Sequence, residues 1–308
     1  MDRAVGNDLK GFLEAIDRPL TFCAESVAPA ILPDLCLDDH GSVPLPVNGA
    51  QADQLAAVGE AAPYGQGTRT VVDPAVRRVT MFPPARVRIA HPGWDAWLAD
   101  RVDEIRERLG LAGRELRPRL HQMLLYRRGD FFLPHRDGEK QDGMVATMAV
   151  VLPSYCTGGD LLVRHGGEER RIAFDGPGRA FEFQVAAWYA DCEHEIEPLA
   201  DGCRLVLIYN LVLHRSRRRV RAPTFTREID GLTRVLGGWA RGMAKGPPRR
   251  LVITLEHAYS QRGLRPDRLK GRDAARAQAL FAAARGAGCR AYLVHLTYRE
   301  VGEAITDY

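Results

Sequence analysis

The feature that most constrains this chain is a run of short strand-like segments between about residues 118 and 213. The segments read HQMLLY, VATMAVVL, DLLVRH, RRIAF, RAFEFQV and RLVLIYNLVL, and turn sequences such as RRGD, TGGD, HGGEE and DGPG separate them. Many short strands with regular turns predict a sandwich, a jelly roll or a barrel. We therefore expect residues 116–214 to form a mainly β core domain.

The residues before this core mix both kinds of secondary structure. Residue patterns predict helices over residues 1–20, 51–62 and 94–110, and the last of these has a glycine stop signal at its end. Alternating segments within residues 69–90 predict strands. Residues 1–115 are interpreted as an N-terminal α/β region that supports the core.

The residues after the core begin with a basic, turn-rich segment, HRSRRRVRAP. Two helical stretches, REIDGLTRVLGGWARGM and DAARAQALFAAARGAG, then alternate with two strand-like stretches, RRLVITLEH and AYLVHLTY. Residues 222–308 are therefore predicted to form a small α/β C-terminal extension. The whole chain is expected to be mainly β, with helices that flank the core.

Composition narrows the classes of protein that fit. The chain has 308 residues with 45% hydrophobic content, enough for a buried core, and its net charge of +4 is small for a dedicated nucleic-acid-binding protein. The basic run of residues 215–221 is interpreted as a solvated loop, so a nucleic-acid partner is not expected. The six cysteines are scattered, and there is no signal-like segment and no run of 18 apolar residues. These features predict a cytoplasmic protein with reduced thiols and no membrane span.

Three residues have the types and spacing of a metal site. In FFLPHRDGEK, His135 and Asp137 stand two residues apart, and residues at this spacing on a strand project to the same face. His194 follows 57 residues after Asp137, just before the last strong strand. Two histidines and one carboxylate can occupy one face of Fe(II) and leave open positions for other ligands. An HxD pair alone is a weak signal, and the third ligand makes it stronger.

Arg204 stands ten residues after His194, at the start of an otherwise apolar strand. A buried arginine there requires an anionic partner, and its guanidinium can bind a carboxylate through two parallel hydrogen bonds. We therefore expect Arg204 to bind the distal carboxylate of 2-oxoglutarate.

Three segments resemble the prolyl 4-hydroxylase-like branch of the 2-oxoglutarate/Fe(II) oxygenases. They are LLYRRGDFFLPHRDGEK, TMAVVLPSYCTGGDLLVRHGG and WYADCEHEIEPLADGCRLVLIYNL. The resemblance covers about residues 118–213. It implies a double-stranded β-helix (jelly-roll) core, with Fe(II) as the cofactor, 2-oxoglutarate as the cosubstrate, O₂ as the oxidant and ascorbate in a supporting role. It also implies that Tyr126 hydrogen-bonds 2-oxoglutarate and that Thr147 lines the same pocket. Many animal and plant prolyl hydroxylases have lysine where this chain has Arg204.

The expected activity is hydroxylation of an unactivated C–H bond in a prolyl or other amino-acid residue of a protein or peptide. Asp137 favours hydroxylation, because halogenating relatives lack this carboxylate. A free amino acid or a small natural-product intermediate stays open as the substrate. A non-catalytic metal-binding sensor and a cupin with another metal are further alternatives, although Arg204 has no use in the latter. Base repair is disfavoured because Asn210 stands where such enzymes carry a second arginine. The oligomeric state is left open.

Overall fold

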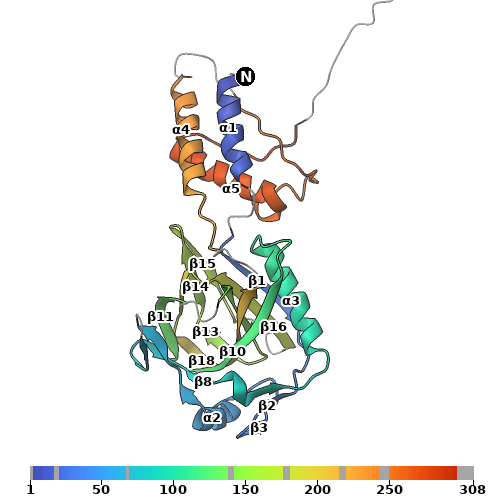
Figure 1. Cartoon of the computed structure of the whole chain (residues 1–308), viewed down its shortest axis with the longest axis vertical. Coiled ribbons are helices and arrows are strands. Elements are labelled where there is room, and N and C mark those ends of the chain that lie inside the picture. Colours follow the sequence, from blue (N-terminus) through green and yellow to red (C-terminus); the bar gives the residue numbers. More distant parts are fainter. Residues whose placement is uncertain are drawn as a thin grey trace, which may run out of the picture. The chain divides into compact units, whose positions relative to one another are not determined.

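The computed structural model describes residues 3–16, 21–66, 69–137, 142–175, 181–214, 220–242 and 250–296. The chain separates into two compact units (Figure 1). Unit 1 comprises Met1–Leu20 and Phe225–Tyr308, and unit 2 comprises Thr21–Thr224. The predicted basic loop falls largely outside the described residues, because these omit residues 215–219.

The larger sheet of unit 2 has eight strands, and every pairing within it is antiparallel. Its central strands are long and apolar, and every residue of one of them, Met144–Val151, is buried. The strand order is β1 (Cys23–Pro29), β16 (Glu182–Tyr189), β12 (Met144–Val151), β18 (Leu199–Leu213), β10 (Leu116–Arg127), β8 (Thr80–Phe82) and β4 (Glu60–Ala61), with β13 (Cys156–Gly158) paired to β18.

The smaller sheet of unit 2 has five strands, again antiparallel. Its order is β15 (Glu168–Ile172), β14 (Leu161–His165), β17 (Glu193–Ile196), β11 (Phe131–Arg136) and β7 (Arg77–Arg78). Along the chain, β10, β12, β16 and β18 lie in the larger sheet, whereas β11, β14, β15 and β17 lie in the smaller one. The chain therefore crosses repeatedly between the sheets, and residues of both line one cavity.

Smaller elements complete unit 2. A three-stranded sheet contains β3 (Gly41–Ser42), β2 (Leu35–Leu37) and β9 (Val87–Ile89), and a two-stranded sheet contains β5 (Tyr64–Gln66) and β6 (Arg69–Val71). Helix α2 (Gly49–Val58) begins with a capping box in which the Asn48 and Gln51 side chains each bond the other's backbone amide. A short 3₁₀ turn, η1 (Pro84–Arg86), precedes β9.

Helix α3 (Trp94–Arg108) covers part of the larger sheet and contacts β1 and β10. Its apolar stripe is buried, as the sequence predicts. Two polar contacts anchor it: the Tyr189 hydroxyl donates to the Leu109 carbonyl at 2.7 Å, and Trp94 Nε1 donates to the Tyr209 hydroxyl at 3.3 Å. The chain leaves the helix through Gly110, whose φ of +69° explains the glycine stop.

Unit 1 contains helices α1 (Arg3–Ala15), α4 (Thr226–Gly242) and α5 (Gly271–Gly286) and a 3₁₀ turn, η3 (Pro266–Arg268). Its small core packs Leu9, Leu13, Ile16, Leu232 and Leu236 against four buried alanines of α5. The sequence assigns residues 1–20 to the region that supports the β core. In the structure, α1 packs instead against α4, within unit 1.

The α/β character predicted for the C-terminal extension is wrong for the described residues, because residues 225–242 and 250–296 contain no strand. The described parts of the two strand-like stretches, residues 250–257 and 291–296, belong to no strand ladder. Several of their apolar side chains are exposed: Val252, Ile253, Tyr292, Val294 and Leu296. Alternation fits a strand, but a strand forms only where a neighbouring edge accepts its backbone hydrogen bonds. None of the described helices in either unit has the length and apolar character that a membrane span requires.

Candidate metal centre

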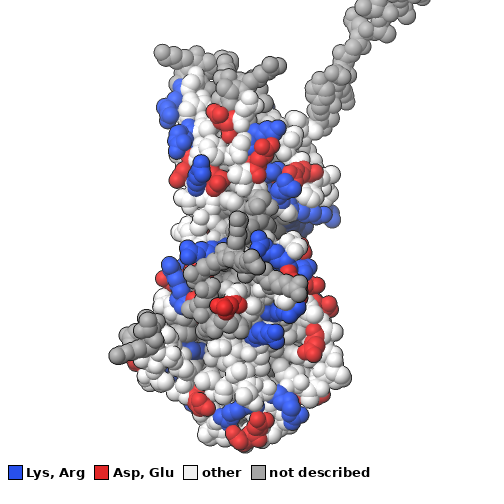
Figure 2. All heavy atoms as spheres, viewed as in Figure 1, with Lys and Arg blue, Asp and Glu red and all other residues white. Residues whose placement is uncertain are grey.

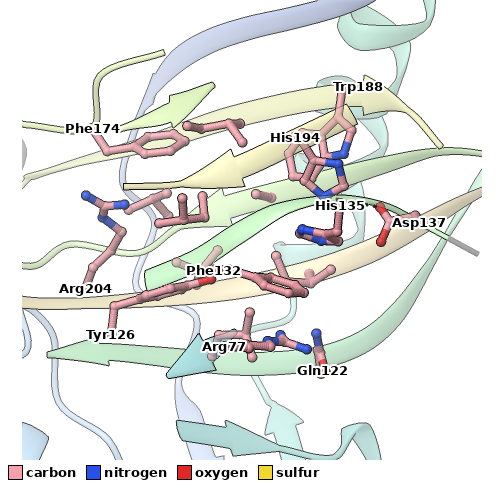
Figure 3. A pocket seen from close by; sticks show the side chains of 17 residues that line it. Arg77, Gln122, Tyr126, Phe132, His135, Asp137, Phe174, Trp188, His194 and Arg204 are labelled. Carbon is pink, nitrogen blue, oxygen red and sulfur yellow. Dashed lines mark ion pairs between the residues drawn. The ribbon is translucent and has the colours of Figure 1, made fainter. Parts of the chain in front are cut away.

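The three predicted metal ligands converge at one end of the cavity (Figure 3). Strands β11 and β17 pair antiparallel with His135 directly opposite His194, and Asp137 follows the end of β11. One ligand atom from each of the three residues lies within 4.8 Å of the other two, and His194 Nε2 is 3.7 Å from Asp137 Oδ2. The cross-strand register thus joins residues that are far apart in the sequence.

Backbone carbonyls orient both imidazole rings. His135 Nδ1 lies 2.9 Å from the Leu133 carbonyl, and His194 Nδ1 lies 3.3 Å from the Cys192 carbonyl. A proton on each Nδ1 would satisfy these carbonyls and leave each Nε2 with a free lone pair for a metal. Burial, together with neighbouring His194, lowers the pKa of His135 to about 3. The ring is therefore neutral, which is the form that binds metals.

Thr147, on β12, is buried next to Asp137. Its hydroxyl donates a 2.6 Å hydrogen bond to Asp137 Oδ2. The sequence predicts that Thr147 lines the cosubstrate pocket, but it is not among the described residues that line the cavity. Its hydroxyl is turned toward the carboxylate instead, so Thr147 orients a predicted metal ligand.

The cavity next to the triad has a volume of about 70 Å³ and lies between the two sheets. Its walls are mostly apolar, and a few polar side chains point into it (Figure 3). The apolar lining residues are Leu124, Phe132, Ala149, Val151, Leu161, Phe174, Trp188, Ile196, Val206 and Ile208. The polar ones are Arg77, Gln122, Tyr126, His135, Asp137, His194 and Arg204. A mostly apolar pocket with convergent polar groups is typical of a small-molecule site.

Arg204 lies on β18, away from the triad, with only 1% of its surface exposed. Its Nη1 and Nη2 donate to the carbonyls of Gly159 and Gly158, both at 2.6 Å, and its guanidinium lies 4.9 Å from the Phe174 ring centre. Its Nε has no hydrogen-bond partner, and no acidic side chain pairs with it in the described part of the chain. A buried guanidinium in this state fits an anionic ligand.

Two adjacent glycines supply the carbonyls that bind Arg204. Gly158 and Gly159 have φ values of +70° and +69°, a region that favours glycine. A Cβ at Gly159 would stand 2.8 Å from Arg204 Nη2. Glycine is therefore required there both by the backbone conformation and by the closeness of the guanidinium.

Tyr126 lies on β10 directly opposite Arg204 in the strand register. Its side chain is buried and lines the same cavity. Burial raises the pKa of Tyr126, although Arg77 and Arg204 act in the opposite direction. The phenol is thus protonated and can donate a hydrogen bond to a ligand next to Arg204.

Arg77 is a cavity residue that the sequence does not single out. It lies on β7, opposite Phe132 of β11, with 7% of its surface exposed. Its guanidinium is 4.5 Å from the Phe132 ring centre, and Phe132 in turn stacks on His135. The segment TVVDPAVRRVTMF shows no spacing that relates Arg77 to the triad, because β7 reaches the site only by pairing with the edge of β11.

The other residues near the triad have structural partners. Trp188 lines the cavity with its ring centre 4.8 Å from that of His194, so it forms part of the wall. Glu193 and Glu195 pair with Arg164 and do not belong to the metal cluster. All six cysteines are free thiols, and burial raises the pKa of Cys203 to about 11, which keeps this thiol protonated.

Figure 2 shows Lys and Arg side chains interspersed with Asp and Glu over the face that it draws. The described residues on this face form no broad surface of a single charge. The absence of a nucleic-acid partner nevertheless stays a prediction.

No family model and no curated protein matches this sequence. Among solved structures, the chain is similar to a prolyl-4-hydroxylase from Pseudomonas putida, with 18% identity, a TM-score of 0.36 and coverage of 66% of this chain and 98% of that one. It is similar to a 2OG-Fe(II) oxygenase family oxidoreductase from Burkholderia pseudomallei, with 20% identity, a TM-score of 0.34 and coverage of 70% and 94%.

A third similar structure is a prolyl hydroxylase from Trichoplax adhaerens in complex with a hypoxia inducible factor peptide fragment, with 14% identity, a TM-score of 0.36 and coverage of 69% and 94%. At TM-scores this low, the likeness carries no argument about function, which rests on the site itself. Prolyl hydroxylases and a 2OG-Fe(II) oxygenase family protein are nonetheless among the solved proteins that this chain resembles.

Proposed function

We propose that this protein is an Fe(II)- and 2-oxoglutarate-dependent dioxygenase that hydroxylates an unactivated C–H bond. One observation carries the proposal: a cluster of two histidines and one carboxylate shares a buried cavity with Arg204, which has no acidic partner in the described chain. The cluster has the donor set of non-haem Fe(II) oxygenases, and the arginine supplies the carboxylate site that a keto acid needs.

The fold assigned with this function is the double-stranded β-helix, or jelly roll. Its support is the strand order: β16, β12, β18 and β10 are neighbours in one sheet, and β15, β14, β17 and β11 are neighbours in the other. The chain therefore passes repeatedly between the two sheets, as a jelly roll requires. His135 and His194 lie on the smaller sheet at one end of the cavity, and Asp137 follows its strand β11.

In this proposal His135, Asp137 and His194 hold Fe(II), which supplies O₂ activation and C–H oxidation when bound. Thr147 holds Asp137 by its 2.6 Å hydrogen bond. The Arg204 guanidinium, together with the Tyr126 hydroxyl, binds the distal carboxylate of 2-oxoglutarate. The apolar walls exclude water, which strengthens the charge interactions in the cavity and protects the reaction from the solvent.

The substrate proposed first is a prolyl or other amino-acid residue, on the basis of the motif resemblance. A free amino acid or a small natural-product intermediate is the second candidate. A non-catalytic sensor is disfavoured, because the chain keeps both the complete triad and the arginine beside a cavity. Support by ascorbate and a cytoplasmic location stay predictions.

The test is succinate formation by protein reconstituted anaerobically with Fe(II), ascorbate and 2-oxoglutarate and then exposed to O₂. We expect uncoupled succinate formation in the native protein and its loss in His135→Ala and Arg204→Ala. His295→Ala and Arg119→Ala are matched controls, because both residues are exposed and lie outside the cavity. Folded, iron-loaded protein that shows neither succinate nor the charge-transfer absorbance of bound 2-oxoglutarate would refute the proposal.

A further inference from the structure

The cavity contains a second buried arginine, Arg77, whose hydrogen-bonding capacity is only partly used. Its Nη1 donates to the Pro63 carbonyl, and its guanidinium faces the Phe132 ring at 4.5 Å. Its Nε is buried and has no hydrogen-bond partner among the described residues. More than nine-tenths of the residue is buried, yet it lines the cavity. An incompletely bonded cation in such a place is costly unless a ligand completes it.

Arg77 and Arg204 occupy different parts of the cavity. Figure 3 shows Arg77 beside Gln122 and beneath Phe132, near the metal ligands, whereas Arg204 lies toward Phe174. Arg77 therefore lies on the side of the cavity nearer the triad, and Arg204 lies on the side nearer Phe174. Two different ligands can therefore bind the two arginines.

The net charge of the cavity also favours an anionic ligand beside Arg77. Arg77 and Arg204 are cations, and Asp137 is the only acidic side chain among the described residues that line it. Burial raises the pKa of Tyr126, so that its phenol is neutral, and metal-bound histidines are neutral as well. Fe(II) and the 2-oxoglutarate dianion cancel each other. One positive charge then stays uncompensated in a buried site, which a singly charged anion would neutralise.

We propose that Arg77 binds a carboxylate group of the substrate that is oxidised, with Gln122 as a neighbouring polar contact. This inference rests on the proposed function, because the charge balance includes Fe(II) and 2-oxoglutarate. It restricts the substrate to molecules or residues that carry a carboxylate near the C–H bond to be oxidised. Among the proposed candidates, this favours an acidic residue or a free amino acid over a prolyl residue inside a peptide. The planar guanidinium suits this group, since its donors match the two carboxylate oxygens.

A purely structural role for Arg77 predicts a different behaviour. Packing on Phe132 and bonding to the Pro63 carbonyl would support the cavity wall without any preference for charged ligands. Arg78 is a matched control, because it neighbours Arg77 on β7 but is half-exposed, pairs with Asp130 at 3.3 Å and does not line the cavity.

The experiment is isothermal titration of butyrate and of its neutral isostere butyramide into anaerobic protein loaded with Fe(II) and saturating 2-oxoglutarate. Arg77→Met removes the charge and Arg77→Lys retains it without the guanidinium, so that a loss of folding in one variant leaves the other to be measured. A capped tripeptide, acetyl-Gly-Glu-Gly-amide, tests whether the carboxylate is accepted within a peptide. The affinity for 2-oxoglutarate is read separately from its charge-transfer absorbance.

We expect native protein to bind butyrate at least about tenfold more tightly than butyramide. Arg77→Met should abolish this preference and Arg77→Lys should weaken it, both with unchanged affinity for 2-oxoglutarate, and Arg78→Met should behave like native protein. Equal affinities for butyrate and butyramide in native protein would overturn the inference. So would a loss of 2-oxoglutarate affinity in Arg77→Met as large as in Arg204→Ala, which would assign Arg77 to the cosubstrate.

Failure of the proposed function would be recognised from the absorbance measurement rather than from the titration. Native protein that forms no charge-transfer band would refute 2-oxoglutarate binding. The titration heats would still show whether Arg77 distinguishes a carboxylate from an amide, because they do not depend on the band.

Discussion

The two units differ in whether their buried polar side chains have hydrogen-bond partners. In unit 2, Arg77 and Arg204 keep buried nitrogen atoms without partners, and every unpartnered buried side-chain atom found in the described residues belongs to this unit. In unit 1, the buried carboxylate of Asp273 accepts hydrogen bonds from the Glu256 and His257 amides, the His257 ring and the Tyr259 hydroxyl. Asp273 is thus satisfied by its own chain, whereas the unpartnered nitrogen atoms of Arg77 and Arg204 lie at the cavity, where a ligand can bind them.

The cores of the units differ as well. The core of unit 2 is built from large aliphatic and aromatic side chains on paired strands, and that of unit 1 packs a few leucines against alanines. Strand pairing fixes the position of each residue in unit 2, so the site can hold ligands at defined distances. This contrast predicts different responses to substitution in the two units.

The largest effect on stability is expected in the β core. Leu207 is fully buried on β18, between Met123 of β10 and Val150 of β12. Leu207→Ala should lower the free energy of unfolding by about 3–5 kcal/mol, because neighbours fixed by two ladders cannot close the cavity. Leu232→Ala, at an equally buried position of α4, should cost about 2–3 kcal/mol, since a small helical core relaxes more easily. Urea denaturation measures both, and a larger loss for Leu232 would reverse the comparison.

A smaller effect is expected where a side chain acts only through a proposed metal ligand. Thr147→Val removes the hydrogen bond to Asp137 at nearly constant volume. We expect Fe(II) affinity to fall by about 10- to 100-fold, as is usual when a partner of a metal ligand is lost, and the unfolding of the metal-free protein to change much less. Thr147→Ser keeps a hydroxyl and should restore most of the affinity. Unchanged Fe(II) affinity in Thr147→Val would show that Asp137 is held by other contacts.

Asp273 provides the corresponding test in unit 1, where stability rather than ligand binding should respond. Burial acts to raise its pKa, but the hydrogen bonds from Glu256, His257 and Tyr259 outweigh burial and lower it. A lowered carboxyl pKa stabilises the fold above the unfolded value of about 4, and this contribution is lost as the pH falls through the lower folded pKa.

Asp273→Asn should therefore cost about 2 kcal/mol at neutral pH, with the difference from native protein shrinking at acidic pH. Hydrogen exchange of the residues 256–259 reports the loss locally. A difference that persists unchanged to the most acidic pH at which the protein folds would contradict the role of the carboxylate charge.

The smallest effect is expected in the strand-like stretch of unit 1. Ile253 is partly exposed and belongs to no ladder in the described structure. Ile253→Pro should change stability by less than about 0.5 kcal/mol, as is usual for substitutions outside packed or hydrogen-bonded positions. A paired strand would lose about 3 kcal/mol. A loss of the larger size would show that this stretch forms a strand, as its alternation predicts.

Local patterns in the sequence predicted the β domain, the helix over residues 94–110 and the three residues of the triad. Most of these depend on short-range periodicity or spacing: alternation of apolar residues, a helical stripe with a glycine stop, and His135 and Asp137 two residues apart. His194 stands 57 residues after Asp137, so its place in the triad depends on the motif resemblance as well. The resemblance of the motifs added Tyr126, and the structure places it opposite Arg204. The resemblance implies that Thr147 lines the cosubstrate pocket, whereas in the structure its hydroxyl donates to Asp137, because the direction of a hydroxyl depends on the acceptor beside it.

Only the tertiary structure showed which segments meet. Three contacts join residues that are far apart in the sequence. His135 lies opposite His194, Arg77 lies opposite Phe132, and α1 packs against α4. The two stretches of unit 1 that alternate like strands have no ladder partner in the described structure. The sequence by itself therefore determined the local elements and the identity of the three residues that converge. The pairings, and with them the second arginine of the cavity, were decided by the tertiary structure, because a strand's hydrogen bonds are completed by an edge that no local pattern specifies.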